Sequence, residues 1–332
     1  MAACSRICSL GLLLLLVLVV DPVRADWFQA GQDKMGTRIF VRLWHEDGVR
    51  AQQLLADAMA EVDRIEAAMS TYRADSEISR VNREAADGWV PVSRELFDLI
   101  QQALELSSRT GGAFDITYDS VGQLYDFKRR ARPSTDQVDE SLPAVDYRHV
   151  QLDKDAVAIR FRHPGVRINL GGIAKGYAVE SVIRRLRAAG VDHALANAGG
   201  DTRVLGSRIS DNGRDGPWIV GVREPDDEMQ FVAKVALDDE AVSTSGDYEQ
   251  FFIEEGVRYH HILNPTTGRS AGAVRSVTVI GPDATMTDGL STSVFVMGLA
   301  AGRALIDALP GYEVIIVDRD ANLHSTAGVR FH

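Results

Sequence analysis

The sequence predicts a protein of the α+β class, in which helices and strands both occur without alternating regularly along the chain. Apolar residues recur at three- and four-residue spacing in some segments and alternate with polar residues in others, the patterns of helices and strands. From residue 218 onward, strand patterns predominate. No segment repeats at a fixed period, which argues against solenoids and propellers. These observations favour α+β over a doubly wound parallel sheet.

The first half of the chain is expected to contain a strand and two long helices. Alternation predicts a strand from Arg38 to Trp44, and apolar spacing predicts a helix from Val49 to Met69. Ser93 can cap a second helix, which runs towards Ser108 and ends at Gly111-Gly112.

The middle of the chain begins with its most polar segment. Residues from Lys128 to Tyr147 lack periodicity and include two prolines, which predicts a surface loop at about 128–147. The elements expected next are two short strands within Val150 to Ile159, a strand from Val166 to Asn169, a helix from Ile173 to Ala189 closed by Gly190, and a strand from Ala194 to Asn197.

The remainder is expected to be mostly strand. The expected strands are Trp218 to Arg223, Phe231 to Leu237, Phe251 to Ile253, Tyr259 to Leu263 and Val274 to Ile280. A helix from about Met286 to Leu299, then a further helix and strand, complete the chain.

Residues 1–25 have the pattern of an export signal. Arg6 gives a positive start, Leu10 to Val20 form an unbroken apolar run, and residues 21–25 end it with the small-residue pattern of a cleavage site. The alternative is an uncleaved membrane anchor, although the run is shorter than the ~20 residues of a spanning helix. Cys4 and Cys8 both precede the run, so we expect no lipid anchor, and a mature chain without disulfide, thiolate ligand or cysteine nucleophile.

Removal of the signal would leave about 307 of the 332 residues, enough for one large domain or two with a substantial apolar core. The whole chain has a net charge of −11, and the residues removed carry +1, so the mature charge is about −12. This acidity argues against a general nucleic-acid-binding surface. We expect an exported, periplasmic protein that is associated with the inner membrane only if the signal stays uncleaved.

A glycine-rich turn at residues 168–178, INLGGIAKGYA, has the chemistry of a phosphate loop but not the spacing of a common one. Gly171 and Gly172 allow a ligand close to the backbone, and the following helix would direct free N–H groups and its positive dipole end at that ligand. Lys175, in the first turn, opposes the dipole unless an anion is present. The spacing fits neither Walker A nor the dinucleotide fingerprint. A tight turn without a ligand is the alternative.

Residues 286–292 contain a candidate metal site. Asp288 and Thr292 are four residues apart and share a helix face, and their carboxylate and hydroxyl oxygens suit Mg²⁺. The alternative is that Asp288 caps its helix and Thr292 hydrogen-bonds to its own backbone.

Two adjacent histidines precede an Asn-Pro turn. Strand alternation puts His260 and His261 on opposite faces, so together they make a poor chelate. One could accept a proton or contact a phosphate, and a solvent-exposed histidine is the alternative. Residues 69–79 and 110–117 each place polar groups beside an aromatic at a helix end, which is also compatible with ordinary capping.

Taken together and in this order, these stretches resemble the ApbE family of FAD:protein FMN transferases. The resemblance extends from about Met35 to Leu299. It rests on MGT (35–37), MSTYRADSEISRVN (69–82), TGGAFDIT (110–117), the glycine-rich turn, NAGGD (197–201), AVSTSGDYEQFF (241–252), HHILNPTTG (260–268) and TDGLSTSVFVMG (287–298).

The resemblance implies a T-fold-related α+β architecture of antiparallel sheets with flanking helices, forming one domain over residues 26–332 with an FAD site in the cleft between subdomains. It also implies Mg²⁺-dependent transfer of FMN from FAD to a threonine or serine of an exported or membrane redox protein, with release of AMP. The metal ligands would be Asp288, Thr292 and the carbonyl of Gly172. The residues implied to line the FAD site are Met35, Tyr72, Ala113, Phe114, Asp115, Asn169, Lys175, His261 and Ile262.

The sequence departs from the family pattern at three positions. Asn169 stands where family members often have aspartate, which removes a possible charge near FAD. Gly289 stands where others have alanine or serine, and Ser291 occupies a position that can be a second acidic ligand. A metal site with one carboxylate predicts modest Mg²⁺ affinity in the absence of FAD.

In the implied reaction, the acceptor hydroxyl attacks the FMN phosphorus while Mg²⁺ and Lys175 stabilise charge on the diphosphate. His261 is the first candidate for the proton acceptor, and Asp288 is the second because a metal-bound carboxylate is a poorer base. Two other functions are compatible with the same residues: a Mg²⁺-dependent FAD pyrophosphatase giving FMN and AMP, and a non-catalytic exported FAD-binding protein.

Overall fold

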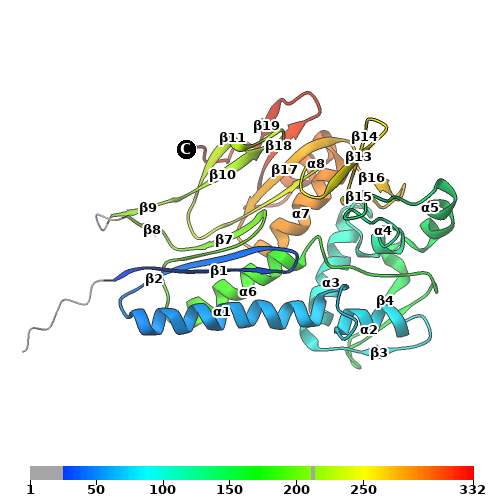
Figure 1. Cartoon of the computed structure of the whole chain (residues 1–332), viewed down its shortest axis with the longest axis horizontal. Helices are drawn as coiled ribbons and strands as arrows, with labels where there is room; N and C mark the ends of the chain where they lie inside the picture. The colour runs from blue at the N-terminus through cyan, green and yellow to red at the C-terminus, as the bar shows by residue number, and fades with distance from the viewer. Residues whose placement is uncertain (1–24, 211–213) are drawn as a thin grey trace, which may run out of the picture.

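An eight-stranded, wholly antiparallel sheet organises the protein (Figure 1). The computed structural model describes residues 25–210 and 214–332. Each neighbouring pair of strands in this sheet is antiparallel. In spatial order the strands are β1 (Asp26–Lys34), β2 (Thr37–His45), β6 (Ala194–Ala198), β7 (Asp201–Leu205), β12 (Ala241–Gly246), β17 (Val274–Gly281), β18 (Glu313–Asp318) and β19 (Leu323–Ser325).

Helices cover one face of the sheet. α1 (Gly48–Met69), α6 (Ala174–Ala188) and α7 (Ala284–Met297) lie along it, and α8 (Leu299–Asp307) follows α7 (Figure 1). Strand alternation sends Ile39, Val41 and Leu43 of β2 towards this face, where they are buried among apolar residues of α1 and α6.

A long hairpin covers the opposite face of the sheet. Its strands are β10 (Trp218–Glu224) and β11 (Asp227–Leu237). Trp218 and Val235 pack there against Val242 of β12 and Ile315 of β18. Because strand β17 is covered on both faces, almost all of its residues are buried, including the polar Ser276 and Thr278.

A helical lobe lies at one end of the sheet (Figure 1). Its helices are α2 (Glu77–Glu84), α3 (Arg94–Arg109), α4 (Asp119–Gly122) and α5 (Thr135–Ser141), with the 3-10 turns η1 (Ile116–Tyr118), η2 (Leu142–Ala144) and η3 (Tyr147–His149). A small sheet in the order β3 (Val90–Pro91), β5 (Ala158–Phe161), β4 (Val150–Asp153) completes the lobe. Three short hairpins lie outside both sheets: β8 (Arg208–Ile209) with β9 (Asp215–Gly216), β13 (Phe251–Glu254) with β14 (Val257–His260), and β15 (Leu263–Asn264) with β16 (Arg269–Ser270).

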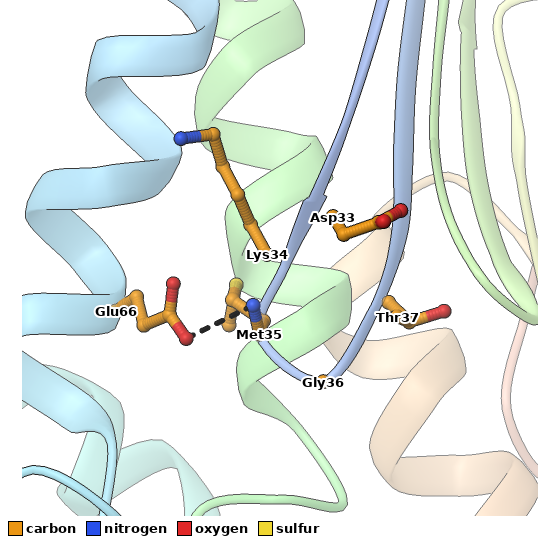
Figure 2. Close-up of a pocket in the computed structure, with 6 residues that line it drawn as sticks. All are labelled: Asp33, Lys34, Met35, Gly36, Thr37 and Glu66. Atoms are coloured by element: carbon orange, nitrogen blue, oxygen red, sulfur yellow. Dashed lines mark hydrogen bonds between the residues drawn. The ribbon is translucent and has the colours of Figure 1, made fainter.

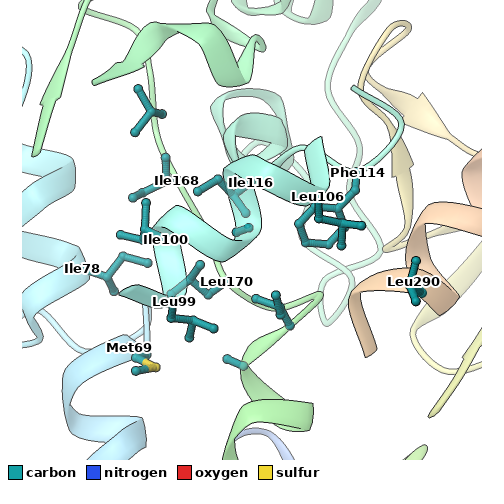
Figure 3. Close-up of a cluster of buried hydrophobic side chains, with 14 of the residues drawn as sticks. Met69, Ile78, Leu99, Ile100, Leu106, Phe114, Ile116, Ile168, Leu170 and Leu290 are labelled. Atoms are coloured by element: carbon teal, nitrogen blue, oxygen red, sulfur yellow. The ribbon is translucent and has the colours of Figure 1, made fainter. Parts of the chain in front are cut away.

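The glycine-rich turn joins the lobe to the sheet layer. Ile168 and Leu170 are fully buried in the core of the lobe, together with Phe114 and with Leu290 of α7 (Figure 3). The helix that follows the turn, α6, packs instead against the main sheet. The turn therefore has a fixed position relative to both parts of the molecule.

The expected α+β class is confirmed, and most expected elements occur within a few residues of their predicted bounds. Three expectations were wrong. The expected loop at 128–147 contains α5, η2 and the start of η3, because Ser134 and Gln137 form a capping box that starts α5. The expected strand Tyr259 to Leu263 is interrupted, since β14 ends at His260 and β15 begins at Leu263.

The third wrong expectation was a strand from Val166 to Asn169. No strand forms there, because side chains satisfy the backbone groups that a neighbouring strand would otherwise pair. The Asn82 amide accepts from the Ile168 N–H at 2.8 Å and donates to the Ile168 carbonyl at 2.9 Å. Ser120 Oγ accepts from the Arg167 N–H at 3.0 Å.

Among the elements that were not predicted are β1, α2, β7 and β12 of the main sheet and the lobe, together with several shorter ones such as β3, α4 and β19. The expected export signal lies almost wholly outside the described residues. Within residues 25–210 and 214–332, no helix is both long and apolar enough to cross a membrane.

A buried carboxylate of α1 binds residues of α6. Glu61 accepts hydrogen bonds from Arg64 at 2.8 and 2.9 Å and from Ser181 at 2.7 Å, and Arg185 lies 2.8 Å away. Burial alone would raise the pKa of Glu61, but these partners outweigh it and lower the pKa to about 2. Because the pKa of Glu61 is lower in the folded chain than in the unfolded chain, its charged carboxylate stabilises the fold at pH values above about 4.5. This stabilisation is lost as the pH falls from about 4.5 to about 2.

We expect Glu61→Gln to reduce the free energy of unfolding by about 3 kcal/mol at pH 7, since a shift of one pKa unit corresponds to ~1.4 kcal/mol. The difference from the wild type should shrink below pH 4.5 and vanish near pH 2. Urea unfolding between pH 7 and pH 2.5 measures it, with the exposed Asp57→Asn on the same helix as control. A difference that stays constant over this pH range would contradict the assigned charge.

Candidate functional site

The glycine-rich turn leads into α6 without a side-chain cap of its own. Asn169 Oδ1 accepts the Gly171 N–H at 2.8 Å, which tightens the turn. Ile173, the N-cap residue of α6, has no side-chain hydrogen bond to the helix. Gly172 lies against Phe114 and Thr292, where an added Cβ would be 3.2 Å from the phenyl ring and 3.5 Å from Thr292 Oγ1.

A carboxylate from another helix supplies the missing cap. Asp288 Oδ2, from the middle of α7, accepts the Gly176 N–H at 2.9 Å. One alternative was that Asp288 caps its own helix. That alternative is wrong, because the N-cap residue of α7 is Asp283. The two helices approach so closely that a Cβ on Gly176 would lie 2.1 Å from the Ala284 carbonyl oxygen and 2.6 Å from Asp288 Cβ.

Lys175 lies between two buried carboxylates. Its Nζ is 2.5 Å from Asp201 Oδ2 and 3.6 Å from Asp288 Oδ1. Burial lowers the pKa of Lys175, but Asp201 and Asp288 outweigh this effect and hold the pKa above its ordinary value. Burial and the charge of Asp201 raise the pKa of Asp288 to about 7, although Lys175 opposes them.

Asp201 was not among the predicted site residues. It lies in the quoted NAGGD segment, but only the pairing of β6 with β7 brings its carboxylate to Lys175. The sequence shows only an aspartate directly after two glycines, and its burial is visible only in the fold.

Hydroxyl groups surround the other predicted metal ligand. Ser245 Oγ lies 3.2 Å from Thr292 Oγ1 and 2.8 Å from Ser291 Oγ. Thr292 thus contacts a neighbouring strand through its hydroxyl. Ser291, where a second acidic ligand was considered, instead donates to the Asp288 carbonyl at 2.9 Å.

The donor set fits a hard divalent cation. Asp288, Thr292 and Gly172 offer a carboxylate, a hydroxyl and a carbonyl oxygen, the donors that Mg²⁺ prefers. Gly172 adjoins Thr292, and its carbonyl accepts no backbone hydrogen bond among the described residues. Within residues 25–210 and 214–332, no group of three or more His, Cys, Asp or Glu side chains is arranged to hold a metal ion.

The two histidines have different environments, although strand alternation does not extend to His261 because β14 ends at His260. His260 is buried, and its Nε2–H donates to the Ala271 carbonyl at 2.7 Å. His261 follows the end of β14, and its buried Nδ1 has no hydrogen-bond partner among the described residues. Burial, together with His260 and Lys175, lowers the pKa of His261 to about 4, so its ring is neutral at pH 7 and able to accept a proton.

Met35 lies at the tip of the β1–β2 hairpin. Both turn residues have positive φ, 52° at Met35 and 72° at Gly36, as a two-residue type I′ turn requires. Glu66 of α1 holds the turn by accepting the Met35 N–H at 3.0 Å, beside a hollow of about 440 Å³ (Figure 2). Thr37 in turn contacts Gly199, two residues before Asp201.

The other predicted FAD-lining residues divide into exposed and inward-facing groups. Tyr72 is 95% exposed, while Phe114 and Ile262 are buried and Ala113 is partly buried. The Asp115 carboxylate accepts from Thr117 and from the Tyr147 N–H, so it stabilises local backbone.

The structure therefore brings Lys175, Asp288, Thr292, Gly172 and the unpredicted Asp201 into one cluster. His261 lies close enough for Lys175 to affect its pKa. Met35 lies on the β1–β2 hairpin, and Thr37 of the same hairpin lies against Gly199.

Sequence comparison identifies related proteins over nearly the whole chain. The profile of the ApbE family matches residues 35–316. The FAD:protein FMN transferase of Treponema pallidum is 32% identical over 310 residues, covering 89% of this chain and 85% of that protein. The FAD:protein FMN transferase of Vibrio cholerae is 31% identical over 334 residues, covering 97% of this chain and 96% of that protein.

Solved structures show the same fold. The ApbE protein of Thermotoga maritima superposes with a TM-score of 0.83 at 31% identity, covering 91% of this chain and 97% of that one. The flavin transferase ApbE of Vibrio cholerae superposes with a TM-score of 0.80 at 28% identity and the same coverage.

We expect Gly176→Ala to lower the free energy of unfolding by about 3 kcal/mol, because the new methyl group would meet the Ala284 backbone and overpack the contact between α6 and α7. This loss should exceed the ~1 kcal/mol by which alanine favours a helix. Gly88→Ala is the matched control, since a Cβ there meets nothing within 4 Å. Denaturant unfolding distinguishes the two variants, and equal stability would show that the helices can separate at no cost.

Proposed function

Because this chain belongs to the ApbE family, we propose that it is a Mg²⁺-dependent FAD:protein FMN transferase. The FMN half of FAD would pass to a threonine or serine of an acceptor protein, with release of AMP. The relatives named FAD:protein FMN transferase support this proposal, and coverage of most of both chains supports its extension to the whole protein.

One arrangement carries the proposal: the first turn of α6, which Asp288 of α7 caps in place of the N-cap residue Ile173, also contains Lys175. The helix end and the ammonium group favour an anion such as a diphosphate. Asp288, Thr292 and the carbonyl of Gly172 would hold Mg²⁺, which when bound would neutralise charge on the diphosphate.

The chain's own residues would then perform the remaining tasks. Lys175, held by Asp201, would stabilise charge on the diphosphate oxygens. A ring nitrogen of His261 would take the proton of the acceptor hydroxyl as its oxygen bonds to the FMN phosphorus and the diphosphate bond breaks, leaving the negative charge on AMP. The ring of His261 is neutral at pH 7 and so has a nitrogen free to accept this proton, while its lowered pKa makes it a weaker base than an ordinary histidine.

We also propose that the protein acts after export, on an exported or membrane redox protein. The pattern of residues 1–25 supports this location. Detection of the processed chain in a periplasmic fraction would test it.

The decisive experiment incubates the purified protein with FAD, with and without Mg²⁺ and a peptide that contains an acceptor threonine. Mass spectrometry should find FMN attached to the peptide and AMP in solution, only when Mg²⁺ is present. Free FMN and AMP would indicate a pyrophosphatase, and intact bound FAD would indicate a binding protein without catalysis.

We expect Asp288→Asn to reduce transfer about a hundredfold or more, the usual effect of removing one electrostatic group from an active site. The amide oxygen can still accept the Gly176 N–H, so the variant removes charge with little change in shape. Chromatographic quantification of AMP measures the loss, with the exposed Asp307→Asn as control. Full Mg²⁺-dependent activity in Asp288→Asn would exclude this residue from the metal site.

We expect His261→Ala to bind FAD within about threefold of the wild type but to lower kcat by ~10²–10⁴, the usual contribution of a general base. Fluorescence titration gives the affinity, and single-turnover kinetics gives the rate. An unchanged rate with saturating FAD and peptide would assign the proton transfer to another group.

A further inference from the structure

Asn169 joins three segments at the start of the glycine-rich turn. Its Oδ1 accepts the Gly171 N–H at 2.8 Å. Its Nδ2 lies 3.3 Å from Thr71 Oγ1 and 3.2 Å from Asp119 Oδ1. Both ends of the amide are thus used by the protein, and Asn169 connects the turn to the segment that carries the exposed Tyr72.

The carboxylate of Asp119 determines how this amide is oriented. Asp119 is buried and lies at the start of α4, with its Oδ2 at 2.5 Å from Nε of Arg167. Since a carboxylate only accepts, the group facing it must be a donor, and the amide nitrogen of Asn169 is that donor. The amide oxygen is thereby directed at Gly171.

An aspartate at position 169 would put two carboxylates about 3.2 Å apart in a partly buried place. Arg167 is the cation that faces them, and the hydroxyls of Tyr118 and Tyr72 are the other titratable groups nearby. One cation cannot balance two such carboxylates, so one of them would be protonated or displaced.

We propose that Asp119 is a positioning residue, which acts through Asn169 to fix the glycine-rich turn and the Thr71–Tyr72 segment relative to each other. This inference rests on the proposed function, because the turn and Tyr72 are the parts expected to hold FAD. Asp119 itself touches no predicted metal ligand or reacting group. Asp119 orients the side-chain amide of Asn169, and this amide in turn determines the conformation of the glycine-rich turn.

The proposal can be tested by exchanging the carboxylate and the amide between positions 119 and 169. Asn169→Asp should weaken FAD binding about tenfold at pH 8, measured by flavin fluorescence titration, and the loss should diminish at pH 5.5 as one carboxylate takes up a proton. The double variant Asp119→Asn with Asn169→Asp restores one donor and one acceptor in exchanged places, and should bind FAD within about threefold of the wild type at pH 8.

Asn322→Asp is the matched control, since the Asn322 amide also donates to a carboxylate, that of Asp318, in an exposed turn. It should leave FAD affinity unchanged at both pH values. Equal affinity of Asn169→Asp and the wild type across the pH range would overturn the proposal, and so would a double variant no better than Asn169→Asp.

A second measurement separates this inference from the proposed function. Hydrogen exchange of the ligand-free protein should be faster at residues 70–73 and 169–172 in Asn169→Asp, and should return to the wild-type rate in the double variant. If the wild type bound no FAD, the proposed function would fail, and the exchange data alone would still decide the inference: unchanged rates in Asn169→Asp would overturn it.

Discussion

The contact between Asp288 and the first turn of α6 is the interaction on which the candidate site depends. One carboxylate oxygen takes the place of a side-chain N-cap, and the other faces Lys175. The contact requires glycine at position 176, because α6 and α7 meet there with no space for a side chain. A single buried carboxylate therefore aligns two helices, holds a lysine and remains a candidate cation ligand.

Much of the fold could be predicted from local sequence patterns, such as the spacing of apolar residues and the residues that begin or end a helix. Helical spacing, Ser93 and Gly190 predicted α1, α3 and α6 well, because these helices have amphipathic faces and their own end signals. Residues 166–169 were misjudged because the partners of their backbone are the side chains of Asn82 and Ser120, which are distant in sequence. No local pattern carries that information.

In the candidate site, too, local patterns could be predicted, whereas contacts between residues distant in the sequence could not. Asp288, Thr292 and Lys175 could be predicted because each lies in a stretch with its own chemical pattern, which the family resemblance then connected. Asp201 could not, because its contact with Lys175 depends on strand pairing across the main sheet. Two predicted FAD-lining residues, Asp115 and Asn169, have polar atoms that bind the protein itself, so they shape the surroundings of the site.

The capping of α6 by α7 also has a consequence for the time at which the site can form. The turn and α6 are complete once residue 188 has been made, but Asp288 and Leu290 are about a hundred residues further along the chain. Until that part has been synthesised, the Gly176 N–H has no carboxylate partner and the core of the lobe lacks a buried leucine. Since chains are made from the N-terminus, the site is assembled only when the polypeptide is nearly complete. A truncated product that ends before α7 would contain the glycine-rich turn intact in sequence but without the partner that orders it.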